Sequence, residues 1–224
     1  MLHYFQLFQE CLPSLMSGLY VTLLMALTSI FFAFIIGVIL GLFSLSQFAA
    51  LRAFARLYIY IVRGVPLMIL GLFLFFGVGA VLSIRFNPLA AAIIVLTINA
   101  SAYMAEIFRG GIQAIDIGQT EAARSLGLGY LKTMRKVVLP QAIKIMIPAF
   151  LNQFITTLKD TSILSVISVR ELTLNGQIII ARNYLPFEVY SYVAIMYLVI
   201  ITLLSLLSKY VEGRLNYDYK GQRN

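Results

Sequence analysis

Long apolar runs separated by short polar segments dominate the chain. The first run, from Cys11 to Leu51, contains no charged residue. It exceeds the roughly 20 residues that a helix needs to cross a membrane. Four more apolar runs follow. We therefore predict an all-α membrane protein with a single transmembrane domain over residues 1–224, containing a polar loop at 109–142 and spans at about 17–42, 57–82, 89–108, 143–169 and 189–207.

The composition agrees with this pattern. Hydrophobic residues make up 61% of the chain and charged residues 12%, which leaves too little polar surface to cover a soluble domain. The net charge of +8 does not indicate a nucleic-acid partner, because the charges lie between apolar runs and form no basic and aromatic patch. With one cysteine, Cys11, and one histidine, His3, we expect no internal disulfide, metal site or catalytic triad.

The distribution of basic residues predicts the orientation. Five spans place the two ends of the chain on opposite sides of the membrane, and lysine and arginine concentrate on the cytoplasmic side of membrane proteins. One side would carry Arg52, Arg56, Arg109, Arg124, Lys132, Arg135, Lys136, Lys144, Lys209, Arg214, Lys220 and Arg223, and the other only Arg85, Arg170 and Arg182. We therefore predict an external N-terminus, a cytoplasmic C-terminus and a cytoplasmic loop at 109–142.

That loop contains a spaced motif. Glu121-Ala122-Ala123 is followed by Gly127 and then, after a nine-residue gap, by Val137-Val138-Leu139-Pro140. We expect a short helix with Thr120 as its N-cap, because a threonine hydroxyl followed by an acidic residue satisfies the free amides of a first turn. The glycines that follow would end this helix.

The motif resembles the EAA loop of the membrane subunits of ATP-binding-cassette (ABC) importers, with Val137 where that family usually has isoleucine. The resemblance implies the type I importer fold and a coupling helix that docks on a separate ATPase. An ordinary basic loop of another membrane protein is the alternative. The residues that the resemblance assigns to ATPase coupling are Glu121, Ala122, Ala123, Arg124, Gly127, Leu128 and Gly129.

Three charged residues fall inside predicted spans. They are Arg63, Lys159 and Asp160. Each would cost on the order of 3 kcal/mol near the bilayer centre, so each needs a partner, a wet cavity or a route to the interface. Arg63 has two interpretations, either extension toward the cytoplasmic surface or a place on the translocation path. Gly64 and Pro66 after it would loosen the helix.

Lys159 and Asp160 suggest a substrate site, because a free amino acid carries both an ammonium and a carboxylate. The alternative is that neighbouring helices satisfy the pair. The stretches Arg63 to Pro66 and Leu158 to Ser162 resemble polar amino acid permeases, and this resemblance favours the substrate interpretation. The predicted substrate-binding residues are Lys159, Asp160, Thr161, Ser162, Asn99, Ser101 and Arg63.

Helix contacts are also predicted. Glu106 and Arg109 are three residues apart and are expected to pair near the inner surface. Gly37 and Gly41 have the four-residue spacing of a close helix contact.

We predict the membrane subunit of an ATP-driven importer for polar, and among them basic, amino acids in a bacterial plasma membrane. The chain has no GxxxxGK[ST] phosphate loop, so we expect no cofactor or enzymatic activity of its own, and ATP would be bound by a partner ATPase. The resemblance further implies a second permease subunit, identical or not, and an external solute-binding protein.

Two other classes of membrane protein are alternatives. In an ion- or proton-coupled carrier, Asp160 would be the proton site, whereas an intramembrane enzyme would need a paired catalytic constellation that this chain does not offer.

Overall fold

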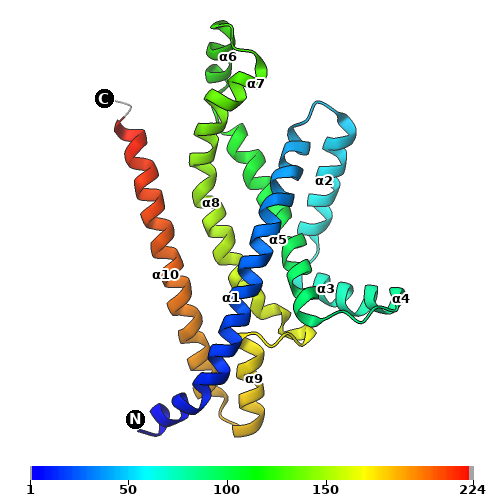
Figure 1. The fold of residues 1–224 in the computed structure, drawn as a ribbon, viewed down its shortest axis with the longest axis vertical. Coiled ribbons are helices and arrows are strands. Elements are labelled where there is room, and N and C mark those ends of the chain that lie inside the picture. The colour runs from blue at the N-terminus through cyan, green and yellow to red at the C-terminus, as the bar shows by residue number, and fades with distance from the viewer. Residues whose placement is uncertain (1, 222–224) are drawn as a thin grey trace.

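The computed structural model describes residues 2–221, which contain helices and no strand. The long helices run roughly side by side, while α3 and α4 project to one side (Figure 1). The elements are α1 (Leu2–Leu45), α2 (Ala49–Gly64), α3 (Leu67–Leu72), the π-helix η1 (Phe73–Val78), α4 (Gly79–Leu82), α5 (Pro88–Gln113), α6 (Ile117–Ser125), α7 (Tyr130–Thr133), the π-helix η2 (Met134–Val138), α8 (Leu139–Asp160), the 3-10 helix η3 (Thr161–Ile167), α9 (Leu172–Asn183) and α10 (Pro186–Gly221).

Four helical segments within residues 2–221 are long and apolar enough to cross a membrane. They are Gln6–Leu45, Pro88–Gln113, Tyr130–Ile167 and Pro186–Arg214. A fifth crossing is counted if the bent pair Ala49–Gly64 and Leu67–Leu82 forms one span. These segments overlap all five predicted spans. The described helices extend beyond both predicted bounds in the first, third and fifth spans, and begin before the predicted start in the second and fourth.

The second predicted span, 57–82, is not one continuous helix. It begins earlier, at Ala49, and bends by 102° between Gly64 and Leu67. The cause is local. Pro66 disfavours the helical conformation of the residue before it, and Val65 is extended, with φ −102° and ψ 128°. The sequence suggested a loosened helix here, and the structure shows that the helix ends.

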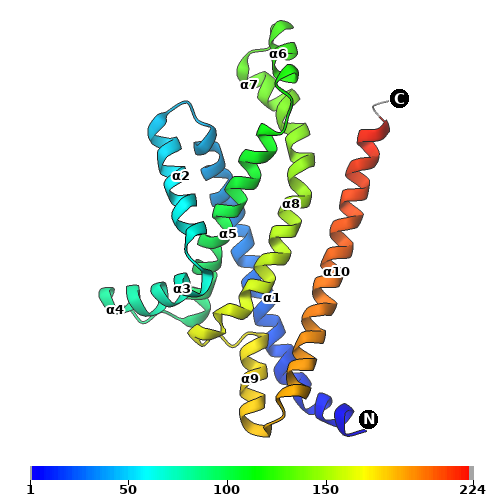
Figure 2. The same cartoon turned by 180° about the vertical axis from the view of Figure 1, so that it is seen from behind.

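The two ends of the bundle differ. The end of α10 lies on the same side as α6 and α7, while the start of α1 lies with α9 at the opposite end (Figures 1 and 2). Five crossings, with the bent pair counted as one, would place the two ends of the chain on opposite sides in this way. We call the α6 side the inner end and the α9 side the outer end.

The α1–α5 contact forms the centre of the fold. Gly37 and Gly41 of α1 face α5, where a Cβ on Gly37 would meet Met104 and a Cβ on Gly41 would meet Phe108. The predicted close helix contact is therefore confirmed. Around it α5 buries mainly small residues, which let the two backbones approach. The buried residues of α5 include Ala91, Ala92, Val95, Ala100, Ala102 and Ala105.

Candidate functional site

A cavity of about 390 Å³ lies where α2 ends, between α5 and α8. The break at Val65 and Pro66 forms part of its wall, so the same proline that ends α2 shapes this cavity. Its lining residues are Arg63, Gly64, Val65, Pro66, Leu67, Asn99, Tyr103, Gln153, Thr156 and Asp160. We call it the outer cavity.

Asp160 provides the negative charge of the outer cavity. It is the last residue of α8 and is partly buried. Within residues 2–221 no hydrogen bond or ion pair holds its carboxylate. Lys159, its neighbour, is exposed and does not line the cavity. Neighbouring side chains on a helix point about 100° apart, so only one of the two charges faces this space.

The structure brings together some of the predicted substrate-binding residues and not others. Arg63, Asn99 and Asp160 line the outer cavity. Ser101 is buried elsewhere, with its hydroxyl 2.8 Å from both the Ile98 carbonyl and the Tyr58 hydroxyl.

The remaining predicted hydroxyls serve the backbone of their own helical turn. Thr161 donates to the Leu158 carbonyl at 2.7 Å, and Ser162 donates to the Lys159 carbonyl at 2.7 Å. Neither lines the outer cavity.

Two polar residues of the cavity were missed. Gln153 and Thr156 precede Asp160 on α8, at steps of three and four residues that place them on one helix face. This spacing was visible in the sequence once Asp160 had been selected. The cavity therefore has a polar stripe along α8 opposite the basic group at the end of α2.

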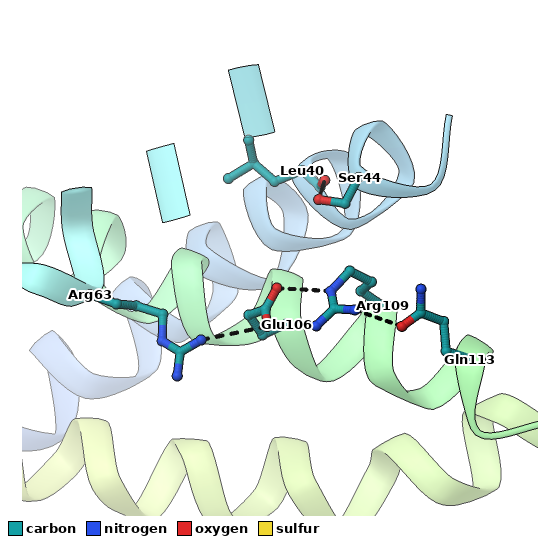
Figure 3. A network of polar contacts seen from close by, with 6 residues as sticks. All are labelled: Leu40, Ser44, Arg63, Glu106, Arg109 and Gln113. Carbon is teal, nitrogen blue, oxygen red and sulfur yellow. Dashed lines mark hydrogen bonds and ion pairs between the residues drawn. The ribbon is translucent and has the colours of Figure 1, made fainter. Parts of the chain in front are cut away.

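A charged network extends from the outer cavity along α5 toward the inner end (Figure 3). Arg109 donates two hydrogen bonds to the Glu106 carboxylate, at 3.0 and 2.9 Å, and a third to the Gln113 side-chain oxygen at 2.6 Å. The predicted Glu106–Arg109 pair is confirmed. Arg63 also approaches Glu106, at 3.5 Å, and its guanidinium lies 5.1 Å from the centre of the Tyr103 ring.

A second cavity, of about 590 Å³, surrounds this network. Its lining residues are Ser44, Arg56, Ile59, Tyr60, Arg63, Gly64, Tyr103, Glu106, Arg109 and Gln113. Of these, Arg63, Gly64 and Tyr103 also line the outer cavity. We call this space the inner cavity, because it lies nearer to α6 along α5.

The predicted coupling motif lies on and just after α6 (Figure 1). The helix starts earlier than expected, because Asp116 and not Thr120 is the cap, and its carboxylate accepts a hydrogen bond from the Gly118 amide at 2.7 Å. Thr120 lies inside the helix. The predicted end is confirmed, since Gly127 has a φ of +79°, a conformation that glycine adopts without strain.

Much of this region faces outward. Glu121 and Arg124 are exposed. So are large apolar side chains that the rest of the described chain leaves uncovered, with exposures of 83% for Leu126 and 80% for Leu131. Ala123 is buried at 5% and anchors the helix. An exposed surface with both apolar and charged groups is typical of a docking site for another protein.

A family model described as binding-protein-dependent transport system inner membrane component matches residues 33–217. The chain belongs to this family. Among similar proteins, the probable glutamine ABC transporter permease protein GlnM of Bacillus subtilis (strain 168) is 36% identical over 91% of this chain and 94% of its own length. The glutamine transport system permease protein GlnP of Escherichia coli (strain K12) is 36% identical over 91% and 94%. The arginine transport system permease protein ArtQ of Bacillus subtilis (strain 168) is 34% identical over 91% and 93%.

Solved structures show the same fold. A chain from a crystal structure of an amino acid ABC transporter with histidines matches with a TM-score of 0.90 and 36% identity, covering 94% of this chain and 98% of that one. A chain of the MetNI methionine ABC transporter in an inward-facing conformation matches with a TM-score of 0.77 at 23% identity, and this likeness concerns the fold alone. The protein is thus a multi-pass inner-membrane permease subunit with the type I ABC importer fold. The carrier alternative gains no support.

Proposed function

We propose that this chain forms the translocation pathway of an ATP-driven importer for polar amino acids and that the outer cavity binds the substrate. The observation that carries this proposal is the pair of opposite charges, Arg63 and Asp160, lining one cavity of about 390 Å³. A free amino acid has a carboxylate for the guanidinium and an ammonium for the aspartate. The names of the similar proteins, which refer to glutamine, arginine and amino acids, support the substrate class.

The charge balance of the outer cavity bears on the side chain of the substrate. Among its lining residues, Asp160 is the single acid. If it binds the α-ammonium group, no second acid is left for a basic side chain. Asn99, Gln153 and Thr156 instead offer amide and hydroxyl groups, which suit an amide or hydroxyl on the substrate. We therefore favour a neutral polar amino acid over the basic one expected from Asp160 alone.

The partners follow from the exposed loop and from the family. We propose that Glu121, Arg124 and Leu126 dock on a cytoplasmic ATPase, that a second permease subunit completes the pathway, and that an external binding protein delivers the substrate at the α9 end. The α6 end would then be cytoplasmic and the start of α1 external, in agreement with the distribution of lysine and arginine. ATP binding and hydrolysis belong to the partner.

The test is uptake of a panel of labelled amino acids by the complex in proteoliposomes, with and without ATP. Asp160→Asn removes the negative charge and keeps the size of the side chain. Since a hydrogen bond to a charged group contributes about 1.5–3 kcal/mol, we expect KM to rise roughly 10- to 100-fold. Glu10→Gln, an exposed carboxylate on α1, is the matched control and should leave KM unchanged.

Two results would contradict the proposal. Uptake that follows an ion gradient and ignores ATP would point to a carrier. A KM unaffected by Asp160→Asn but raised by Lys159→Gln would move the substrate away from the outer cavity to the exposed side of the same turn.

A further inference from the structure

The inner cavity carries more positive than negative charge. Arg56, Arg63 and Arg109 line it, and Glu106 is the single carboxylate among its lining residues. Grouped cations without matching anions repel one another, and a bound anion relieves that repulsion. Tyr60 and Tyr103 also line it.

The three arginines are not held equally. Arg109 is fixed by two short hydrogen bonds to Glu106 and a third to Gln113. Arg63 makes one contact to Glu106, at 3.5 Å, and its side chain is 43% exposed. Because Arg109 already neutralises Glu106, Arg63 can leave that carboxylate without stranding a buried negative charge (Figure 3). Within residues 2–221, no ion pair holds Arg56.

Arg63 also connects the two cavities. It lines both of them, together with Gly64 and Tyr103. A carboxylate bound by Arg63 on the outer side therefore lies next to a second space whose surplus charge attracts the same group. The inner cavity lies toward the α6 end, which is the cytoplasmic end in the proposed orientation.

We infer that the inner cavity is a second, weaker binding site for the carboxylate of the transported amino acid, formed by Arg56 and Arg63 on the way to the cytoplasm. This inference rests on the proposed function of the outer cavity. Arg63 holds the carboxylate in the outer cavity and turns with it toward Arg56 in the inner one. No bond is made or broken, and Glu106 stays paired with Arg109 throughout.

A carboxylate site in the inner cavity, unlike a merely basic surface, predicts that bound substrate there weakens the outer site. A single guanidinium cannot serve both cavities at full strength, so an amino acid bound in the inner cavity weakens the outer site. Accumulated substrate in the cytoplasm should therefore slow further uptake, through the permease itself. Removal of Arg56, which lines only the inner cavity, should relieve this inhibition while the outer site stays intact.

The experiment uses the complete complex in proteoliposomes that are preloaded with increasing concentrations of the unlabelled substrate. ATP-driven uptake of labelled substrate is measured from outside. We expect luminal substrate to inhibit the wild type, and Arg56→Gln to raise the half-inhibitory luminal concentration roughly tenfold, the effect of losing one partly solvated charge partner. The inhibition of each protein is measured relative to its own uptake from vesicles without luminal substrate, so a change in the basal uptake of Arg56→Gln does not affect the comparison.

Lys209→Gln is the matched control. It removes one basic charge from an exposed position on α10, which lies on the other side of the bundle from α2 (Figure 1). Its half-inhibitory concentration should equal that of the wild type. Equal inhibition in all three proteins would assign the effect to the ATPase partner and overturn the inner site, as would uptake that luminal substrate does not inhibit.

The lipid composition of the vesicles distinguishes a bound substrate carboxylate from a bound anionic lipid headgroup. If an anionic lipid headgroup fills the inner cavity, the effect of Arg56→Gln will appear in vesicles containing phosphatidylglycerol and vanish in pure phosphatidylcholine, and the carboxylate site is then wrong.

If no amino acid is taken up with ATP in the wild type, the proposed function itself fails. Normal uptake without luminal inhibition would refute the inner site alone.

Discussion

Glu171 offers the sharpest test of how the outer end of the fold is held together. It is the N-cap of α9, and its side chain is fully buried at 0% exposure. Its carboxylate accepts hydrogen bonds from the amides of Thr173 at 2.8 Å and Leu174 at 2.7 Å, and from the Tyr197 hydroxyl at 3.0 Å. It therefore ties the start of α9 to α10. We predict that Glu171→Ala destabilises the protein without touching either cavity.

The size of the effect can be estimated from these contacts. Loss of an N-cap costs about 1 kcal/mol. Loss of the hydrogen bond that the Tyr197 hydroxyl donates to Glu171 costs about another 1 kcal/mol, since that hydroxyl keeps its longer contact to the Thr173 hydroxyl, at 3.4 Å. The sum of about 2 kcal/mol corresponds to a decrease in Tm of roughly 4–8 °C for a chain of this size. Tyr197→Phe removes only the hydroxyl, so it should lower Tm by about half as much.

Cys11 provides the assay. It is the one cysteine of the chain, is buried at 5% exposure, and packs in the same apolar cluster as Leu172 and Val189. A maleimide dye that fluoresces on reaction with a thiol will therefore report the opening of this region as the purified full chain is heated in detergent. If Glu171→Ala melts at the wild-type temperature, the bonds around Glu171 do not stabilise the native state and this reasoning is wrong.

The pH dependence provides an independent check. Burial raises the pKa of the Glu171 carboxyl above its usual value of 4.5, against the opposing effect of the hydrogen bonds from Thr173 and Leu174. The folded protein therefore holds this proton more tightly than the unfolded chain. Stability from Glu171 is complete at pH values below 4.5 and falls as pH rises through the raised pKa of the folded state. The difference in Tm between wild type and Glu171→Ala should narrow from acidic to neutral pH.

Two further substitutions test the coupling loop and the central helix contact. Glu121→Lys reverses an exposed charge on α6. We expect the complex to assemble but its ATP hydrolysis to lose stimulation by substrate. Normal stimulation would refute the proposed coupling role. Gly37→Ala places a Cβ against Met104 and the Ser101 carbonyl, at an expected cost of about 1–3 kcal/mol in the same thermal assay. Gly110→Ala, where a Cβ meets open space, should be neutral or slightly stabilising, and equal melting of both variants would disprove the close contact.

The positions of the long apolar helices were largely predictable, because hydropathy depends on the sequence alone. The break at Val65 was only half anticipated. Gly64 and Pro66 indicated a weak point, but a proline in a membrane helix can produce a kink or a complete stop. Here the helix stops and a new one begins at once, with Pro66 as the N-cap of α3 and its carbonyl accepting the first helical hydrogen bond from the Leu70 amide, at 3.0 Å.

The candidate site was less predictable, because a search for costly charges finds charged residues only. It led to Arg63 and Asp160, which line the outer cavity, and equally to Lys159, which does not. Gln153 and Thr156 carry no charge, so the cost of burying a charge does not single them out. Ser101 was predicted to bind substrate but does not line the outer cavity. Its hydroxyl already contacts the Ile98 carbonyl and the Tyr58 hydroxyl, and the contact with Tyr58 joins two helices in a way that the sequence does not reveal.

The arrangement of α5 suggests how the proposed substrate site and the proposed coupling loop influence one another. Asn99 near the middle of this helix lines the outer cavity, Glu106 contacts Arg63, and Gln113 at its end lines both the inner cavity and a groove formed with Ile117 of α6. The three positions lie on one continuous helix, at steps of seven residues that keep them on one face. A displacement of α6 that carries α5 with it therefore moves Glu106, the carboxylate that Arg63 contacts, relative to α2. Since Arg63 lines both cavities, the proposed motion of the loop would reach the same guanidinium that we propose binds the substrate carboxylate.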